Sequence, residues 1–143
     1  MTHMASVQWL RVISWGLIVI GCYFSWATAD PVNALSVMFV DLVFLPIDGA
    51  QTYAAQETRL LSAIAGGVTV GLGAAVLTVT NAVYLVDRER GRRVIMTFML
   101  AWFIADGIGS ALAGAPFNAV VNCLILLPVT YPVLAARPDP KSV

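Results

Sequence analysis

The sequence predicts an all-α integral membrane protein, a bundle of four membrane-crossing helices, and two observations carry this prediction. Of the 143 residues, 59% are hydrophobic and 11% are charged, whereas about a quarter of the residues of a soluble domain are charged. A soluble chain this short would leave much of its apolar surface in water. The apolar residues also gather into four runs of roughly 20 residues, the helical length that crosses a bilayer core about 30 Å thick.

The expected spans fall within one transmembrane domain, residues 1–136, followed by a polar cytoplasmic tail at 137–143. In chain order the spans cover about residues 9–29, 60–86, 94–113 and 117–136. Trp9 and Trp26 flank the first span as aromatic residues do at membrane interfaces. Residues 27–29 are similar to a signal-peptidase site, but we expect the first span to be retained, because its apolar run holds three tryptophans and continues past Cys22.

The connection between the first two spans contains a further apolar segment at residues 32–45, interrupted by Asn33, Ser36 and Asp41. This segment is short for a comfortable crossing. We expect it to form a short interfacial helix on the outer side of the membrane, ended by a turn at residues 46–49. A fifth span is the alternative, and it would place the two termini on opposite sides of the membrane.

Charge is distributed unevenly between the connections. The stretch between the second and third spans holds four of the eight basic residues, Arg88, Arg90, Arg92 and Arg93. By the positive-inside rule this basic loop is cytoplasmic, and four spans then place both termini in the cytoplasm. The alternative is a patch that binds DNA or anionic lipid. Because the formal net charge is zero, no overall basic field attracts nucleic acid, and we expect no nucleic-acid partner.

Small residues recur at four-residue spacing on two of the expected helices. They are Ala63, Gly67 and Gly71 on the second span, and Ala105, Gly109 and Ala113 on the third. Residues four apart share a helix face, and small side chains there let another helix come close. We expect these faces to pack inside the bundle. The alternative is a contact surface for a membrane protein partner or a second copy.

Asp106 is the strongest candidate for a functional residue, because it lies inside the third span. At 1.5 Å per helical residue it is roughly 10 Å from the outer end. An ionised carboxylate costs about 2.5–3.5 kcal/mol at the bilayer centre on insertion scales, so it must be paired, hydrated or protonated. We expect Arg59, at the start of the second span, to be its partner. Asn118 and Asn122, one turn apart in the fourth span, complete the predicted polar cluster.

The outer loop carries acidic residues that we expect to close over this cluster, namely Asp41, Asp48 and Glu57. Two interpretations of the cluster stay open. It is either a structural clasp that fixes the helix register or a site that handles a proton or a small ligand.

The sequence lacks the common signatures of enzymes and metal sites. Cys22 and Cys123 lie in separate apolar runs, and His3 is the only histidine, so we expect no metal and no cofactor. There is no phosphate loop, HExxH, GxSxG or CxxC motif. We therefore do not expect an enzyme, although a carboxylate pair such as Asp106 with Asp48 is left open.

Two groups of residues resemble small uncharacterised four-helix membrane proteins of bacteria. The first comprises residues 41–49 (DLVFLPIDG) and 57–61 (ETRLL) with Gly66-Gly67, and the second comprises Asp106-Gly107, Gly109-Ser110, residues 114–118 (GAPFN) and Asn122. The resemblance covers nearly the whole chain after the first span. It implies a multi-pass protein of the bacterial inner membrane and implies no particular activity.

Three functional hypotheses follow. The first is a non-catalytic structural or accessory subunit whose partners are the lipid bilayer and a membrane protein or a second copy. The second is a small transporter or a proton- or ligand-binding protein centred on Asp106, which predicts a cavity that reaches Asp106 from outside. The third is a membrane enzyme that uses carboxylates.

Overall fold

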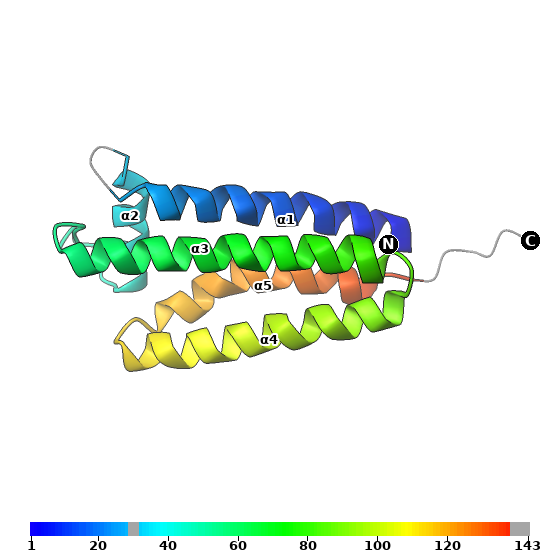
Figure 1. Cartoon of the computed structure of the whole chain (residues 1–143). Coiled ribbons are helices and arrows are strands. Elements are labelled where there is room, and N and C mark those ends of the chain that lie inside the picture. The colour runs from blue at the N-terminus through cyan, green and yellow to red at the C-terminus, as the bar shows by residue number, and fades with distance from the viewer. Residues whose placement is uncertain (29–31, 138–143) are drawn as a thin grey trace, which may run out of the picture.

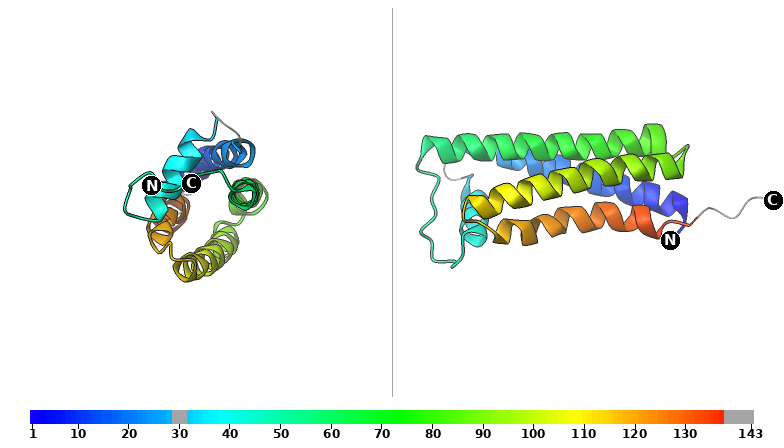
Figure 2. Two further views of the ribbon diagram at one scale, coloured as in Figure 1. Left: turned by 90° about the vertical axis from the view of Figure 1, so that its left-hand side faces the viewer. Right: turned by 90° about the horizontal axis from the view of Figure 1, so that it is seen from below.

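The computed structural model describes residues 1–28 and 32–137, and this part of the chain contains helices and no strand. The elements are α1 (His3–Trp26), α2 (Ala34–Val43), α3 (Gln56–Val79), the π-helical turn η1 (Thr80–Tyr84), α4 (Arg88–Leu112) and α5 (Phe117–Ala135). As predicted, four helices are long and apolar enough to cross a membrane, α3 continuing through η1. These four form a ring in the order α1, α3, α4, α5, and α2 lies across one end (Figures 1 and 2).

The two ends of the bundle differ in construction. Both termini and the turn between η1 and α4 lie at one end, which we call the basic end (Figure 1). There the Arg137 N–H donates to the Met1 carbonyl at 3.1 Å, and Arg88 Nη1 donates to the Ala136 carbonyl at 2.6 Å. The opposite end, the loop end, carries α2, residues 44–55 and the turn between α4 and α5. The predicted tail beyond Arg137 lies outside the described residues.

The basic residues expected in a loop lie instead in the first turns of α4, which begins at Arg88 rather than at residue 94. Asp87 caps this helix, because its side chain accepts the Arg90 N–H at 2.9 Å. Glu89 then pairs with Arg92 one turn later, with an Nε–Oε2 distance of 2.9 Å. The charges remain at the basic end, but helix formation there shortens the connection to three residues, Leu85–Asp87.

The hydrophobic core occupies the half of the bundle nearer the basic end and draws on all four long helices. Its buried members are Val7, Leu10, Leu17, Val76, Tyr84, Ile95, Met99, Val129 and Val133. The Tyr84 hydroxyl lies 2.9 Å from Ser6 Oγ. Because the Ser6 hydroxyl donates to the His3 carbonyl at 2.7 Å, Tyr84 is the donor of this buried hydrogen bond.

Toward the loop end the bundle separates into two helix pairs. α1 and α3 approach so closely that a Cβ added at Gly66 would lie 2.4 Å from Ser25 N and 2.6 Å from the Gly21 carbonyl oxygen. By contrast, α4 has no buried residue after Met99. Figures 1 and 2 both show α4 diverging from α3 toward the loop end and staying beside α5. The half of the bundle nearer the loop end is therefore held within each pair rather than across the ring.

The faces that pack differ from the predicted small-residue faces. A Cβ added at Gly67, Gly71 or Gly109 would meet no atom within 4 Å, whereas one at Gly73 would lie 2.8 Å from the Ser14 carbonyl oxygen of α1. The three alanines of the predicted faces, Ala63, Ala105 and Ala113, are half-buried or exposed. Internal packing is therefore the wrong interpretation for the three glycines. The face of α3 that contacts α1 is displaced by one residue from the predicted face, which is about 100° around the helix axis.

The short helix α2 falls within the apolar segment predicted at 32–45 and covers part of the loop end. The Phe39 ring packs edge-on against Phe24 of α1, with 5.3 Å between ring centroids. Asp41 is buried, and its two carboxylate oxygens accept the Gly49 N–H at 3.1 and 3.2 Å. Asp41 thus ties the following loop to α2 and does not close over Asp106 as expected.

Candidate functional site: a polar cluster between α4 and α5

The turn between α4 and α5 determines how these two helices face each other. Gly114 has a φ of 79°, in the left-handed region that glycine enters without steric cost. The Ala115 N–H donates to the Ser110 carbonyl at 2.9 Å, and the Gly114 N–H donates to the Ala111 carbonyl at 3.1 Å. These paired bonds are those of a helix that ends at such a glycine. Because α5 begins at Phe117, the two helices are antiparallel neighbours.

This short turn places polar side chains of both helices at the same depth. Asp106 and Ser110 are four residues apart on α4, and Asn118 and Asn122 are four residues apart on α5, so each pair lies on one helix face. We call these four residues the Asp106 cluster. Asp106 lies six residues before the end of α4 at Leu112, or roughly 9 Å along the helix.

All the hydrogen bonds to the Asp106 carboxylate reach one of its oxygens, Oδ2. Asn118 Nδ2 donates to Oδ2 at 3.0 Å, Asn122 Nδ2 donates to it in a short bond, and the Ser110 hydroxyl donates at 3.5 Å. Asn118 Nδ2 also lies 2.8 Å from Ser110 Oγ. Within residues 1–28 and 32–137, no donor reaches Oδ1. The three donors are two amides and a hydroxyl, so they bring no positive charge to the carboxylate.

Asp106 faces the interior of the bundle. It lies on the same side of α4 as Ile95 and Met99, which are buried. Met99 is four residues after Ile95 and seven residues before Asp106, and these spacings place all three on one helix face. Asp106 is nevertheless half-buried, because the bundle has separated into pairs at this depth. α4 and α5 also lie near each other at Gly107, where an added Cβ would be 3.7 Å from the Ala119 Cβ, an ordinary van der Waals distance.

Three other predicted members of the site lie elsewhere. Arg59 lines a shallow cavity on the α1–α3 pair, and no ion pair or hydrogen bond between described residues joins it to Asp106. The expected Arg59–Asp106 pair is wrong because α3 leans on α1 and away from α4 at this end. Asp48 Oδ1 accepts the Ala50 N–H at 2.9 Å within the loop, and Glu57 is exposed in the first turn of α3.

Ser110 is the member of the site that sequence reasoning missed. Its position four residues after Asp106 was the available signal, because that spacing places it one helical turn away on the same face. The residue type alone does not indicate a site, because a serine hydroxyl within a helix commonly bonds to its own backbone. Here the hydroxyl instead bridges Asp106 and Asn118.

No protein-family model matches this chain, and no curated protein or solved structure is measurably similar to it. The resemblance to small bacterial four-helix membrane proteins therefore stays a prediction. The function has to be argued from the chemistry of the cluster and its surroundings.

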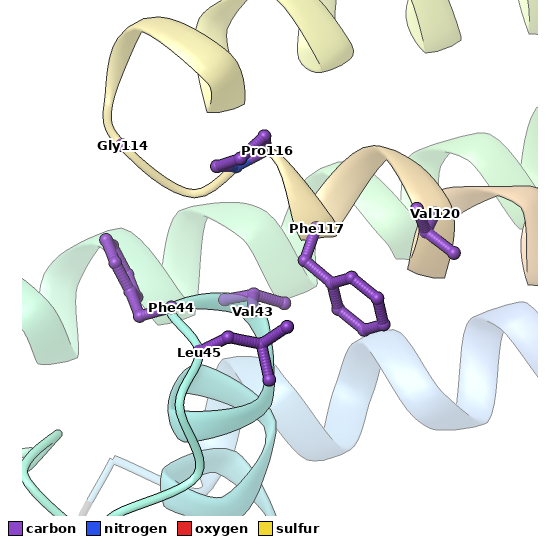
Figure 3. Close-up of a pocket in the computed structure, with 7 residues that line it drawn as sticks. All are labelled: Val43, Phe44, Leu45, Gly114, Pro116, Phe117 and Val120. Carbon is purple, nitrogen blue, oxygen red and sulfur yellow. The ribbon is translucent and has the colours of Figure 1, made fainter.

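The described residues contain no group of three or more His, Cys, Asp or Glu side chains that could hold a metal ion. An apolar groove of about 400 Å³ lies at the loop end between α2 and the start of α5 (Figure 3). Its lining residues are Val43, Phe44, Leu45, Gly114, Pro116, Phe117 and Val120. Asp106 lines neither this groove nor the cavity beside Arg59. Neither of these two is therefore the cavity that the transporter hypothesis predicts at Asp106.

Proposed function

We propose that this chain is a multi-pass membrane protein that binds a small positively charged species, a proton or a cation, at Asp106 and catalyses no reaction. One observation carries the proposal. A carboxylate on the inward face of a membrane-length helix is hydrogen-bonded by neutral groups only, within the described residues. The four apolar helices provide the membrane setting.

The charge of Asp106 favours this function over a purely structural clasp. Amide and hydroxyl donors offset part of the cost of removing a carboxylate from water, but they leave its negative charge in place. That cost is about 2.5–3.5 kcal/mol at the bilayer centre on insertion scales. An asparagine at position 106 would bridge α4 and α5 without this cost, because its side chain carries no charge. A bound cation or proton removes the net charge, so the site has a built-in affinity for positive species.

We also propose an orientation in a bacterial inner membrane. The basic end faces the cytoplasm, because it gathers Arg88, Arg90, Arg92 and Arg93 beside both chain termini. The loop end then faces outward, with α2 in the outer interface and the Asp106 cluster in the outer half of the bilayer.

The test compares Asp106→Asn with Asp48→Asn, a loop substitution of the same kind, in the full chain in lipid nanodiscs. Thermal unfolding is followed by circular dichroism over a series of pH values and salt concentrations. Wild-type protein and Asp48→Asn are expected to gain stability from protons or cations, whereas Asp106→Asn stays folded and loses that gain. If wild type and Asp106→Asn respond alike, Asp106 is a clasp and the proposal fails.

Assembly with a second membrane chain is a second candidate function, favoured by the exposure of Gly67 and Gly71 on α3. Bare backbone on an exposed face allows another helix to approach closely in lipid. Gly67→Leu is expected to weaken an assembly seen by native mass spectrometry, whereas Val68→Leu, an exposed neighbour, leaves it unchanged. A wild-type chain that is monomeric and without partners in native lipid would end this candidate.

A further inference from the structure

We infer that the Asp106 cluster binds a dehydrated, hard, monovalent metal cation, that is, an alkali ion. The inference rests on the proposed function and narrows it from positive species in general to a metal ion. It follows from three features of the cluster: the chemistry of its donor atoms, its net charge and its position between the helix pairs.

The donor atoms that the cluster can offer to a ligand are all oxygens. Asp106 supplies a carboxylate with Oδ1 open, and the Ser110 hydroxyl keeps acceptor lone pairs. Asn118 and Asn122 now turn their NH₂ groups toward Asp106. Rotating either amide by a half turn puts its carbonyl oxygen in the same place, since the two ends of the amide are nearly equal in shape. Oxygen ligands of this kind are those that hard cations prefer.

The net charge of the cluster selects a monovalent ion. It contains one carboxylate, and no charged side chain in the described chain is paired with it. A monovalent cation makes the site neutral, whereas a divalent one leaves a net positive charge in a low-dielectric setting, which is costly. Mg²⁺ also requires near-octahedral coordination and gives up its water reluctantly. Oxygens held on helices within the membrane suit a dehydrated ion of single charge.

The position of the cluster gives the ion a path to it. Asp106 lies on the inward face of α4, in the part of the helix where no residue after Met99 is buried. The buried residues of α3 at this depth, Ser62 and Gly66, both contact α1, since Ser62 Oγ donates to the Phe24 carbonyl at 3.2 Å. Asp106 itself is half-buried, so the cluster is not sealed inside the bundle. Arg59, which would compete with an ion, lies on the α1–α3 pair.

The experiment measures ²²Na⁺ binding to the full chain in nanodiscs of zwitterionic lipid, with choline chloride holding the ionic strength constant. We expect saturable binding of one ion per chain to wild type. Asp106→Asn is expected to weaken binding at least tenfold, and Asp48→Asn, which changes a loop carboxylate outside the cluster, is expected to leave it unchanged. Competition with K⁺ and Li⁺ then ranks the monovalent ions by size.

A second measurement uses wild type alone, so that a misfolded variant cannot obscure the result. NaCl is expected to raise the melting temperature above that in equal choline chloride, since an ion that binds only the folded state stabilises it. The inference is overturned if no alkali cation binds. Proton binding then remains if wild type shows an infrared carboxyl band that changes with pH and that Asp106→Asn lacks. If neither is seen, the proposed function also fails. Equal Na⁺ binding by Asp106→Asn overturns the inference as well.

Discussion

The contact between α1 and α3 provides a sharp test of the fold, because two adjacent glycines of α3 have opposite surroundings. At Gly66 an added Cβ would lie 2.4 Å from Ser25 N and 2.6 Å from the Gly21 carbonyl oxygen, whereas at Gly67 nothing lies within 4 Å. Ordinary carbon contacts are about 3.5–4.0 Å long. Gly66→Ala therefore requires α1 and α3 to separate by roughly 1 Å, and Gly67→Ala requires no movement.

The size of the effect follows from what this separation disrupts. Overpacking of this kind costs about 1–3 kcal/mol. The contact also carries two interhelical hydrogen bonds, from Ser25 Oγ to the Ala63 carbonyl at 3.3 Å and from Ser62 Oγ to the Phe24 carbonyl at 3.2 Å. Such bonds contribute about 0.6 kcal/mol each in a membrane protein. We expect Gly66→Ala to lower the free energy of unfolding by about 2–4 kcal/mol.

The matched variant Gly67→Ala should change the free energy of unfolding by less than about 1 kcal/mol, and in the stabilising direction, because alanine is the better helix former. The assay is reversible unfolding of the purified chain in mixed micelles with increasing SDS, followed by tryptophan fluorescence. Gly21→Ala combined with Gly66→Ala should cost less than the sum of the two, since both act on one contact. Equal stability of Gly66→Ala and Gly67→Ala would refute the close approach of these helices.

Two further predictions use the same preparation, and a third uses the chain in an intact membrane. Gly114→Ala should destabilise by about 1–2 kcal/mol because an L-residue is strained in the left-handed region, whereas Gly109→Ala, within a helix and without neighbours, should not destabilise. Tyr84→Phe should cost about 0.5–1.5 kcal/mol, the net contribution of one lost hydrogen bond, since Ser6 keeps its own bond to the backbone; an unchanged stability would mean that the Tyr84–Ser6 bond contributes nothing. A cysteine at Arg90 should react with a membrane-impermeant maleimide only from the cytoplasmic side; labelling from outside would invert the proposed orientation.

The number and order of the long helices were predictable from hydropathy, but their ends were not. Hydropathy reports which residues suit lipid, and a helix extends further wherever its polar ends are stabilised in other ways. α4 begins at Arg88 because Asp87 caps it and Glu89 pairs with Arg92, so the helix includes charged turns that the apolar pattern excludes. α1 likewise begins at His3, where Thr2 Oγ1 accepts a backbone N–H.

The depth of the polar residues along the bundle was predictable from the sequence. The direction in which each helix faces around its own axis was not. Asp106, Asn118 and Asn122 come together because a four-residue turn fixes the depth and the facing of two neighbouring helices. Arg59 has a suitable depth as well, but its helix turns toward α1 through Gly66. Which of two adjacent glycines forms a helix contact depends on the partner's backbone, and a single sequence contains no direct record of that partner.

Different chemical groups hold the two helix pairs together, and this difference affects where a ligand could act. α1 and α3 meet through backbone atoms at Gly21 and Gly66, a contact that contains no charged group. α4 and α5 are bridged through one oxygen of Asp106 by two amides that can turn. The proposed positive species would neutralise the Asp106 carboxylate and compete with the amide donors for it, so it would alter the α4–α5 pair and leave the α1–α3 pair intact. The charge of Asp106 therefore lies at the helix contact that ligand binding would change. A neutral residue bridging α4 and α5 at that position would not respond to a positive ligand.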